Sequence, residues 1–171
     1  MLQFNPTGTK ILKILHLLVV MTWTVSIIAM WVLSWISYDT GQELFMYYKC
    51  MVWIDRLLTV PAAILSIGTG VFYGLCTPWG FFKQRWIIVK WIVCGVVILL
   101  ASLVFYPACQ HAYGTILQDY DAALNNNQVL TSLKMARDAS FYQAIALIFL
   151  VVISVFKPWR KHRFLNIKQI Y

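Results

Sequence analysis

Four long apolar stretches dominate this chain and decide what it can fold into. They cover roughly residues 11–36, 52–75, 86–108 and 141–156. Each is close to the ~20 residues that a helix needs to cross the ~30 Å hydrocarbon core of a bilayer, and a helix satisfies its own backbone hydrogen bonds in lipid. No internal sequence repeat divides the chain. We therefore predict an all-α, four-helix integral membrane bundle in which residues 1–171 form a single domain.

The composition agrees with a multi-pass membrane protein and argues against a nucleic-acid-binding one. Hydrophobic residues make up 61% of the chain and charged residues only 12%, against about 25% charged in ordinary soluble domains. A net charge of +8 would suit nucleic acid in a soluble domain, but here the surplus lies at helix ends and in the segment 157–163. There it orients the protein and attracts anionic lipid. The expected partner is the lipid bilayer, and no nucleic acid is expected.

The basic residues are distributed unequally between the two sides of the predicted bundle. Because cytoplasmic segments carry the excess of lysine and arginine, we predict that both termini are cytoplasmic and that the protein resides in the cell membrane, as an inner or cytoplasmic membrane protein. The other side holds all six acidic residues and only Lys49, Arg56, Lys134 and Arg137. The ten basic residues of the cytoplasmic side are Lys10, Lys13, Lys83, Arg85, Lys90, Lys157, Arg160, Lys161, Arg163 and Lys168.

The second apolar stretch carries two features that shape a membrane helix. Ser66, Gly70 and Gly74 recur every four residues, a small-x-x-x-small spacing that lets helix backbones approach closely in lipid. Pro61 lies in the same stretch and leaves the carbonyl of Leu57 without its usual donor. We expect close helix packing along the small residues and a kink at the proline.

The connection between the third and fourth stretches, residues 110–140, is patterned as helix on both sides of a break at 125–127, where three asparagines stand together. We predict that spans three and four extend beyond the bilayer as an outward helical hairpin of ~20 Å, with one nearly continuous helix over 128–156. Such a hairpin could contact a partner. The apolar period is carried by Ala112, Ile116, Tyr120 and Ala123 before the break and by Val129, Leu133, Ala136 and Ser140 after it.

The cysteines allow one disulfide and argue against a zinc site. Cys50 and Cys109 fall on the same, non-cytoplasmic side of the predicted topology, so they can pair if that compartment is oxidising. Two free thiols are the alternative. The chain has no C-x-x-C motif and no cysteine and histidine spacing typical of zinc.

Two ionisable residues lie inside predicted spans, where a charge is costly and a functional role is the default hypothesis. His16 lies ~9 Å into the first span, and Lys90 lies at a similar depth in the third. Trp23 shares a helical face with His16, and Trp86 shares one with Lys90. The imidazole can ligate a metal, the ammonium can pair with a propionate, and the indoles can pack on a ring.

Each of these four residues also has an ordinary explanation when it is taken alone. Lys90 can snorkel to the interface, Trp86 can belong to an aromatic belt, and His16 can form a hydrogen bond between helices. A haem held by two histidines is not expected, because His111 lies 21 residues beyond Lys90, or about 30 Å along the helix. His16 is therefore the predicted iron ligand if haem b is bound. A second cluster near the outer helix ends, either functional or made of structural ion pairs, would comprise Asp55, Arg56, His111, Arg137 and Asp138.

Three short motifs, in this order, resemble the HemJ-type protoporphyrinogen IX oxidases, a family of small four- or five-helix membrane proteins. The segment 12–16, LKILH, followed by Trp23, is similar to the first-helix pattern L-K-x-x-H-x6-W. The segment 56–62, RLLTVPA, followed by Gly70, is similar to R-x-L-T-x-P-A…G. The segment 86–90, with its tryptophan and lysine four residues apart, is similar to W-x-H-x-K. Together the motifs fall within residues 10–106.

The resemblance implies a haem-associated histidine at His16 and an activity-linked lysine at Lys90. Ile88 stands where that family has its second histidine, so the haem role carries over to His16 alone. The chain is also similar to related membrane proteins of unknown activity, which share the proline and glycine of the second helix and a Tyr-Pro pair like Tyr106-Pro107.

Two functions of different classes follow from this sequence. The first is the binding of haem or a related tetrapyrrole or quinone-like ligand for redox chemistry, by His16, Trp23, Trp86 and Lys90, with His16 on the iron. If the protein is an enzyme, the resemblance implies a membrane oxidoreductase of the protoporphyrinogen oxidase type, whose catalytic residues are unknown. The alternative is a non-enzymatic accessory subunit that uses its projecting hairpin to bind a membrane protein partner or a second copy of the chain.

Overall fold

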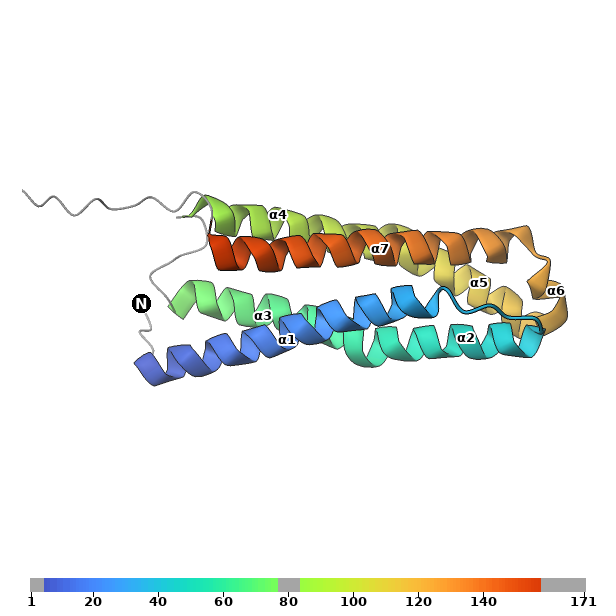
Figure 1. The fold of residues 1–171 in the computed structure, drawn as a ribbon, viewed down its shortest axis with the longest axis horizontal. Coiled ribbons are helices and arrows are strands. Elements are labelled where there is room, and N and C mark those ends of the chain that lie inside the picture. The colour runs from blue at the N-terminus through green and yellow to red at the C-terminus, as the bar shows by residue number, and fades with distance from the viewer. Residues whose placement is uncertain (1–4, 77–83, 158–171) are drawn as a thin grey trace, which may run out of the picture.

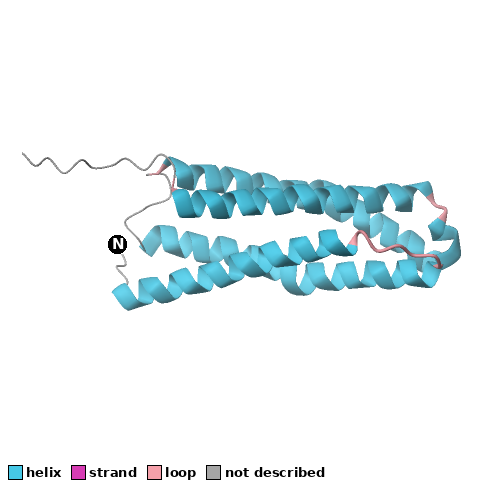
Figure 2. Ribbon diagram, viewed as in Figure 1, coloured by secondary structure: helices cyan, strands magenta, loops and turns pink. Residues whose placement is uncertain are grey.

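The computed structural model describes residues 5–76 and 84–157, and every regular element within these ranges is a helix (Figures 1 and 2). The predicted cytoplasmic loop around Lys83 and the basic tail beyond Lys157 lie outside the described residues. In chain order the elements are α1 (Pro6–Leu33), α2 (Gly41–Ile54), the π-helical turn η1 (Asp55–Thr59), α3 (Val60–Cys76), α4 (Arg85–Leu100), the π-helical turn η2 (Ala101–Phe105), α5 (Tyr106–Gln118), α6 (Tyr120–Leu124) and α7 (Asn127–Phe156).

Four helical segments are long and apolar enough to cross a membrane, which confirms the predicted all-α fold with four apolar helices. They are Thr7–Leu33, Gly41–Leu75, Arg85–Leu103 and Asn127–Phe156. The first ends before residue 36, and the second begins well before residue 52. A capping box starts that second segment. The hydroxyl of Thr40 accepts from the amide of Glu43 at 3.3 Å, and the carboxylate of Glu43 accepts from the amide of Thr40. This Thr-x-x-Glu pattern is a helix-start signal that the apolar pattern alone overlooked.

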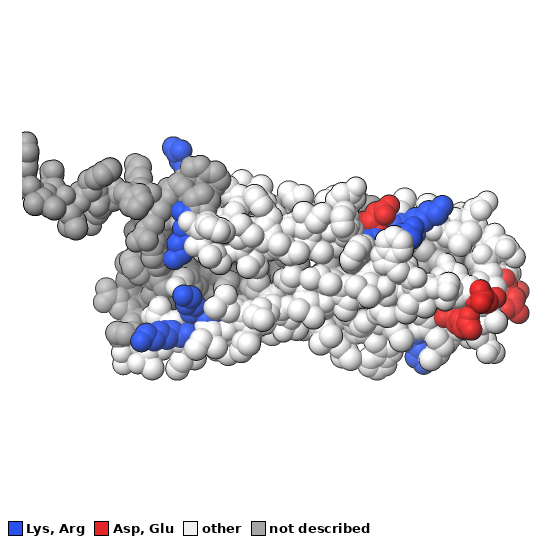
Figure 3. Space-filling view, viewed as in Figure 1, with Lys and Arg blue, Asp and Glu red and all other residues white. Residues whose placement is uncertain are grey.

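The bundle has two halves, each with its own hydrophobic core (Figure 1). We call them the basic half, built from α1, α3, α4 and the C-terminal part of α7, and the acidic half, built from α2, α5, α6 and the N-terminal part of α7. Figure 3 shows lysine and arginine at the end of the basic half and again on the other half, where the acidic residues lie. The basic half is built around Trp23, Ile27, Ala62, Val97, Ala144, Leu147 and Leu150, and the acidic half around Leu44, Tyr48, Ala112, Ile116, Ala123, Val129 and Leu133.

The exposed surface changes character between the two halves. The outer face of α1 in the basic half is apolar and includes Ile14, Leu18 and Val25, each more than half exposed. On α7, no Asp, Glu, Lys or Arg follows Asp138 until Lys157, whereas the preceding turn carries Lys134 and Arg137. So large an exposed apolar face is unfavourable in water and suits lipid.

Each π-helical turn ends two residues before a proline. The amide of Val60 bonds to the carbonyl of Asp55, five residues back, just before Pro61. The amide of Tyr106 bonds to the carbonyl of Ala101 in the same way, just before Pro107. A proline has no amide proton and its ring crowds the carbonyl four residues back. Here the helix forms a wider, π-helical turn before each proline. At Pro61, where a kink was expected, the distortion is therefore a π-bulge.

The connection between α5 and α7 differs in one respect from the expected hairpin. The predicted first arm is not one helix up to the asparagines, because the chain breaks at Asp119, which is extended and whose carboxylate accepts from the amides of Asp121 and Ala122. Tyr120 is consequently exposed. The second arm agrees with its prediction: Asn126 caps α7, which runs unbroken to Phe156. The residues expected on its inner face, Val129, Leu133, Ala136 and Ser140, are all buried.

Candidate functional site

His16 lies half-buried on α1 and turns toward α3. Its Nδ1 atom is 2.8 Å from the hydroxyl oxygen of Thr69. That hydroxyl donates its own proton to the carbonyl of Leu65, at 2.7 Å. With its proton engaged, the Thr69 oxygen would act as the acceptor for Nδ1–H of the imidazole. In that tautomer Nε2 carries the lone pair, as in a metal-ligating histidine whose other nitrogen is held by a hydrogen bond.

Gly70 lies beside the imidazole on the same α3 face. A Cβ atom at this position would be 3.6 Å from Cε1 of His16, an ordinary van der Waals distance. An alanine would fit there, but a larger side chain would displace the ring. Ser66, one turn earlier, is buried, and α1 packs more extensively on α3 than on any other helix. The small residues predicted to mediate helix packing therefore bring α3 close to α1.

Lys90 lies on α4 with its ammonium group 5.6 Å from the centre of the Trp86 ring, a cation–π arrangement. The pairing predicted from their spacing is present, and Trp86 is buried. No Cα atom of α4 lies within 8 Å of a Cα atom of α1 or α3. His16 and Lys90 therefore lie on helices whose backbones do not meet.

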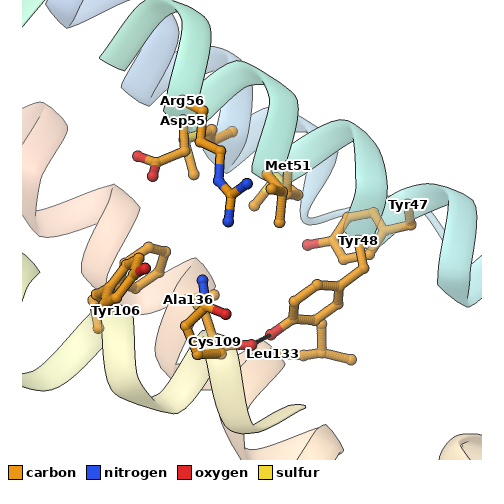
Figure 4. A pocket seen from close by; sticks show the side chains of 13 residues that line it. Tyr47, Tyr48, Met51, Asp55, Arg56, Tyr106, Cys109, Leu133 and Ala136 are labelled. Atoms are coloured by element: carbon orange, nitrogen blue, oxygen red, sulfur yellow. Dashed lines mark hydrogen bonds between the residues drawn. The ribbon is translucent and has the colours of Figure 1, made fainter. Parts of the chain in front are cut away.

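Trp23 does not join this group directly. It is 3% exposed and lies in the core of the basic half, where it lines a cavity of ≈ 250 Å³ between α1, α3, α4 and α7. A smaller cavity of ≈ 40 Å³ lies on the acidic side (Figure 4). Neither of these two cavities is lined by His16 or Lys90. The four predicted ligand-binding residues therefore divide into the pair His16 and Thr69, the pair Trp86 and Lys90, and a separate Trp23.

Asp55 lines both cavities, and Arg56 lines the smaller one. The sequence had grouped these two with three other residues near the outer helix ends. The structure places Arg137 over the Trp35 ring, at 5.2 Å, and leaves His111 exposed on α5. In the described part of the chain, no ion pair joins Asp55 or Arg56 to another residue. Asp55 and Arg56 therefore do not tie helix ends together by ion pairs.

Cys50 and Cys109 are free thiols. Cys50 is exposed on α2, whereas Cys109 is largely buried on α5, where its carbonyl accepts from the hydroxyl of Tyr48 at 3.2 Å. Burial raises the pKa of the Cys109 thiol to about 11, with the negative charge of Asp55 acting in the same direction. The structure therefore corresponds to the free-thiol alternative.

Maleimide labelling should separate these two thiols. At pH 8 we expect Cys50 to react readily and Cys109 to stay unmodified, because the thiolate is the nucleophile and a raised pKa keeps it scarce. Reaction at Cys109 should become appreciable only as the pH approaches 11. The measurement is peptide mass spectrometry of labelled protein in detergent, with denatured protein as the fully reactive control. Equal rates at both cysteines at pH 8 would contradict the burial of Cys109.

No three His, Cys, Asp or Glu side chains of the described chain come together as a metal site. A metal at His16 would therefore have to bring most of its own ligands, as haem iron does with its four pyrrole nitrogens. Sequence reasoning missed Thr69, whose role depends on α3 packing against α1, and the cavities beside Asp55. No known protein family matches the chain, and no curated protein and no solved structure is detectably similar to it.

Proposed function

We propose that this protein binds haem, or a related tetrapyrrole or quinone-like ligand, in the basic half of the bundle for redox chemistry. The observation that carries the proposal is the 2.8 Å contact between His16 Nδ1 and the Thr69 hydroxyl, which holds the imidazole; an Nδ1–H donated to Thr69 would leave the lone pair on Nε2. This nitrogen suits iron better than a quinone, since a quinone carbonyl needs a donor and Nε2 is an acceptor. The resemblance to the HemJ-type oxidases points to the same histidine.

The other predicted residues have defined roles in this proposal. The ammonium group of Lys90 would neutralise a propionate, and the Trp86 ring under it would form an apolar wall. Trp23 would close the site toward the centre of the bundle. Haem iron would supply one-electron redox chemistry, and the chain would hold it through His16, neutralise a propionate through Lys90 and exclude water.

The topology proposed with this function puts both termini in the cytoplasm and the acidic half outside the bilayer. Lys157 and Arg137 are twenty residues apart on α7, and twenty residues of helix measure about 30 Å, the thickness of the hydrocarbon core. The change from apolar to mixed surface occurs at the level of Arg137. The acidic half would then extend outward as a small helical bundle, of which the predicted hairpin is one part.

Absorption spectroscopy of the purified protein tests the proposal. The protein expressed with adequate haem supply should show an intense Soret band, and His16→Ala should abolish it. Thr69→Val should lower haem affinity by about ten- to a hundredfold, because it removes the group that orients the imidazole. Lys90→Met should keep the band position but weaken haem retention on a desalting column, because the ammonium does not ligate iron.

His111→Ala is the matched control, since this histidine is exposed in the acidic half and its loss should leave the spectrum unchanged. Unchanged haem content in His16→Ala would end the proposal. A colourless wild-type protein that co-purifies with another membrane subunit would also contradict it and would favour the accessory-subunit alternative.

A further inference from the structure

The two cavities meet at the boundary between the basic and acidic halves. Asp55, Met30 and Phe105 line both of them. Asp55 belongs to η1 and Phe105 to η2, so the two π-helical turns lie at the same junction. The bulges thus widen the helices at the level where the apolar interior of the bundle meets a charged surface, and π-bulges are frequent at functional sites.

The larger cavity is long enough for part of a hydrocarbon chain. It is lined by Thr59 of η1 and along α3 to Ile67, and along α4 and η2 from Val97 to Phe105. Eight residues of helix span about 12 Å. We call this cavity, of ≈ 250 Å³, the tube.

The lining of this tube changes from polar to apolar along its length. Thr59, Ser102 and Ser140 lie toward the acidic half, whereas Ile67 and Val97 lie toward the basic half. The hydroxyl of Thr59 donates to Ser26 at 3.0 Å and that of Ser140 to the carbonyl of Ala136 at 2.8 Å. With these protons engaged, Thr59 and Ser140 need no polar guest, and the apolar end of the tube suits a hydrocarbon group.

The end of the site toward the acidic half carries one negative and one positive side chain, Asp55 and Arg56. Figure 4 shows the carboxylate of Asp55 and the guanidinium of Arg56 directed to different parts of the smaller cavity, near the rings of Tyr47, Tyr48 and Tyr106. Adjacent in sequence, they form no ion pair with each other or with any other described residue. Asp55 and Arg56 lie close to the non-cytoplasmic surface of the bilayer proposed above, at the level of the lipid head groups.

We propose that this junction is a binding site for a zwitterionic phospholipid with an ethanolamine head group. One acyl chain occupies the apolar tube, the phosphate pairs with the Arg56 guanidinium, and the ammonium donates hydrogen bonds to the Asp55 carboxylate. Phosphatidylglycerol carries the same phosphate but no ammonium, so it leaves the Asp55 carboxylate without a cationic partner. A choline head group has no N–H to donate. The pair of opposite charges thus selects for ethanolamine.

Native mass spectrometry of the full-length protein in mixed micelles tests this site. Dioleoyl phosphatidylethanolamine should bind with a stoichiometry of one and at least about tenfold more tightly than the phosphatidylglycerol or phosphatidylcholine of the same chains, the factor expected for one charge-assisted hydrogen bond. Asp55→Asn should abolish this preference, and Asp55→Glu should restore part of it. Arg56→Gln should weaken the binding of all three lipids. Ala101→Leu, which fills the tube from η2, should also weaken the binding of all three.

Asp138→Asn and Lys134→Gln are the matched controls, because they remove the same charges from exposed positions of α7. Both should bind lipid as the wild type does. Equal binding of phosphatidylglycerol and phosphatidylethanolamine by the wild type, or an unchanged preference in Asp55→Asn, would overturn the proposal.

Discussion

Substitution of Gly41 by alanine is expected to lower the free energy of unfolding by about 3 kcal/mol, the upper part of the usual range for overpacking. Gly41 is the first residue of α2 and is buried against α6. A Cβ atom at this position would overlap the carbonyl group of Tyr120 and would lie 2.8 Å from the amide nitrogen of Asp121. These are backbone atoms, so no side-chain rotation relieves the overlap, and α2 must separate from α6.

Denaturant unfolding in detergent, followed by tryptophan fluorescence, measures this effect. Gly68→Ala and Gly95→Ala are the matched controls, because an added Cβ meets nothing within 4 Å at either position. Both lie inside helices, where alanine is favoured over glycine by about 0.5–1 kcal/mol. The controls should be slightly stabilised. A Gly41→Ala protein as stable as these two would show that α2 and α6 do not pack as described.

Labelling of intact cells should give an all-or-none result for topology. A membrane-impermeant maleimide is expected to react with a cysteine introduced at Asn125, at the tip of the acidic half, and not with one introduced at Lys10 on α1. Both positions are exposed to solvent or lipid head groups. The direction follows from the excess of lysine and arginine that the sequence places on the predicted cytoplasmic side.

Permeabilised cells supply the control, because both cysteines should then react. The wild-type Cys50, which is exposed on α2, provides an internal reference on the same side as Asn125. Labelling of the Lys10 cysteine alone in intact cells would reverse the orientation. Labelling of both before permeabilisation would remove the four-span topology.

Helix number and charge distribution could be predicted from the sequence because each is a local property. A run of about 20 apolar residues favours a membrane helix wherever it occurs, and Asn126 caps α7 through its own side chain. The period of Val129, Leu133 and Ala136 identified the buried face of α7 for the same reason. The start of α2 was missed although its signal, Thr40 and Glu43, was also local.

The sequence by itself determined that this chain forms apolar helices, that basic and acidic residues gather at opposite ends, and that His16 and Lys90 are candidates for a ligand site. Only the tertiary structure decided which atoms meet. Thr69 is 53 positions from His16, and the carbonyl of Tyr120 that confines position 41 comes from a different helix. Likewise, the cavity beside Asp55 depends on the two π-helical turns, η1 and η2, lying at the same depth in the bundle. These contacts depend on the rotation and depth of one helix against another, which short-range patterns do not encode because many residues must pack at once to set them.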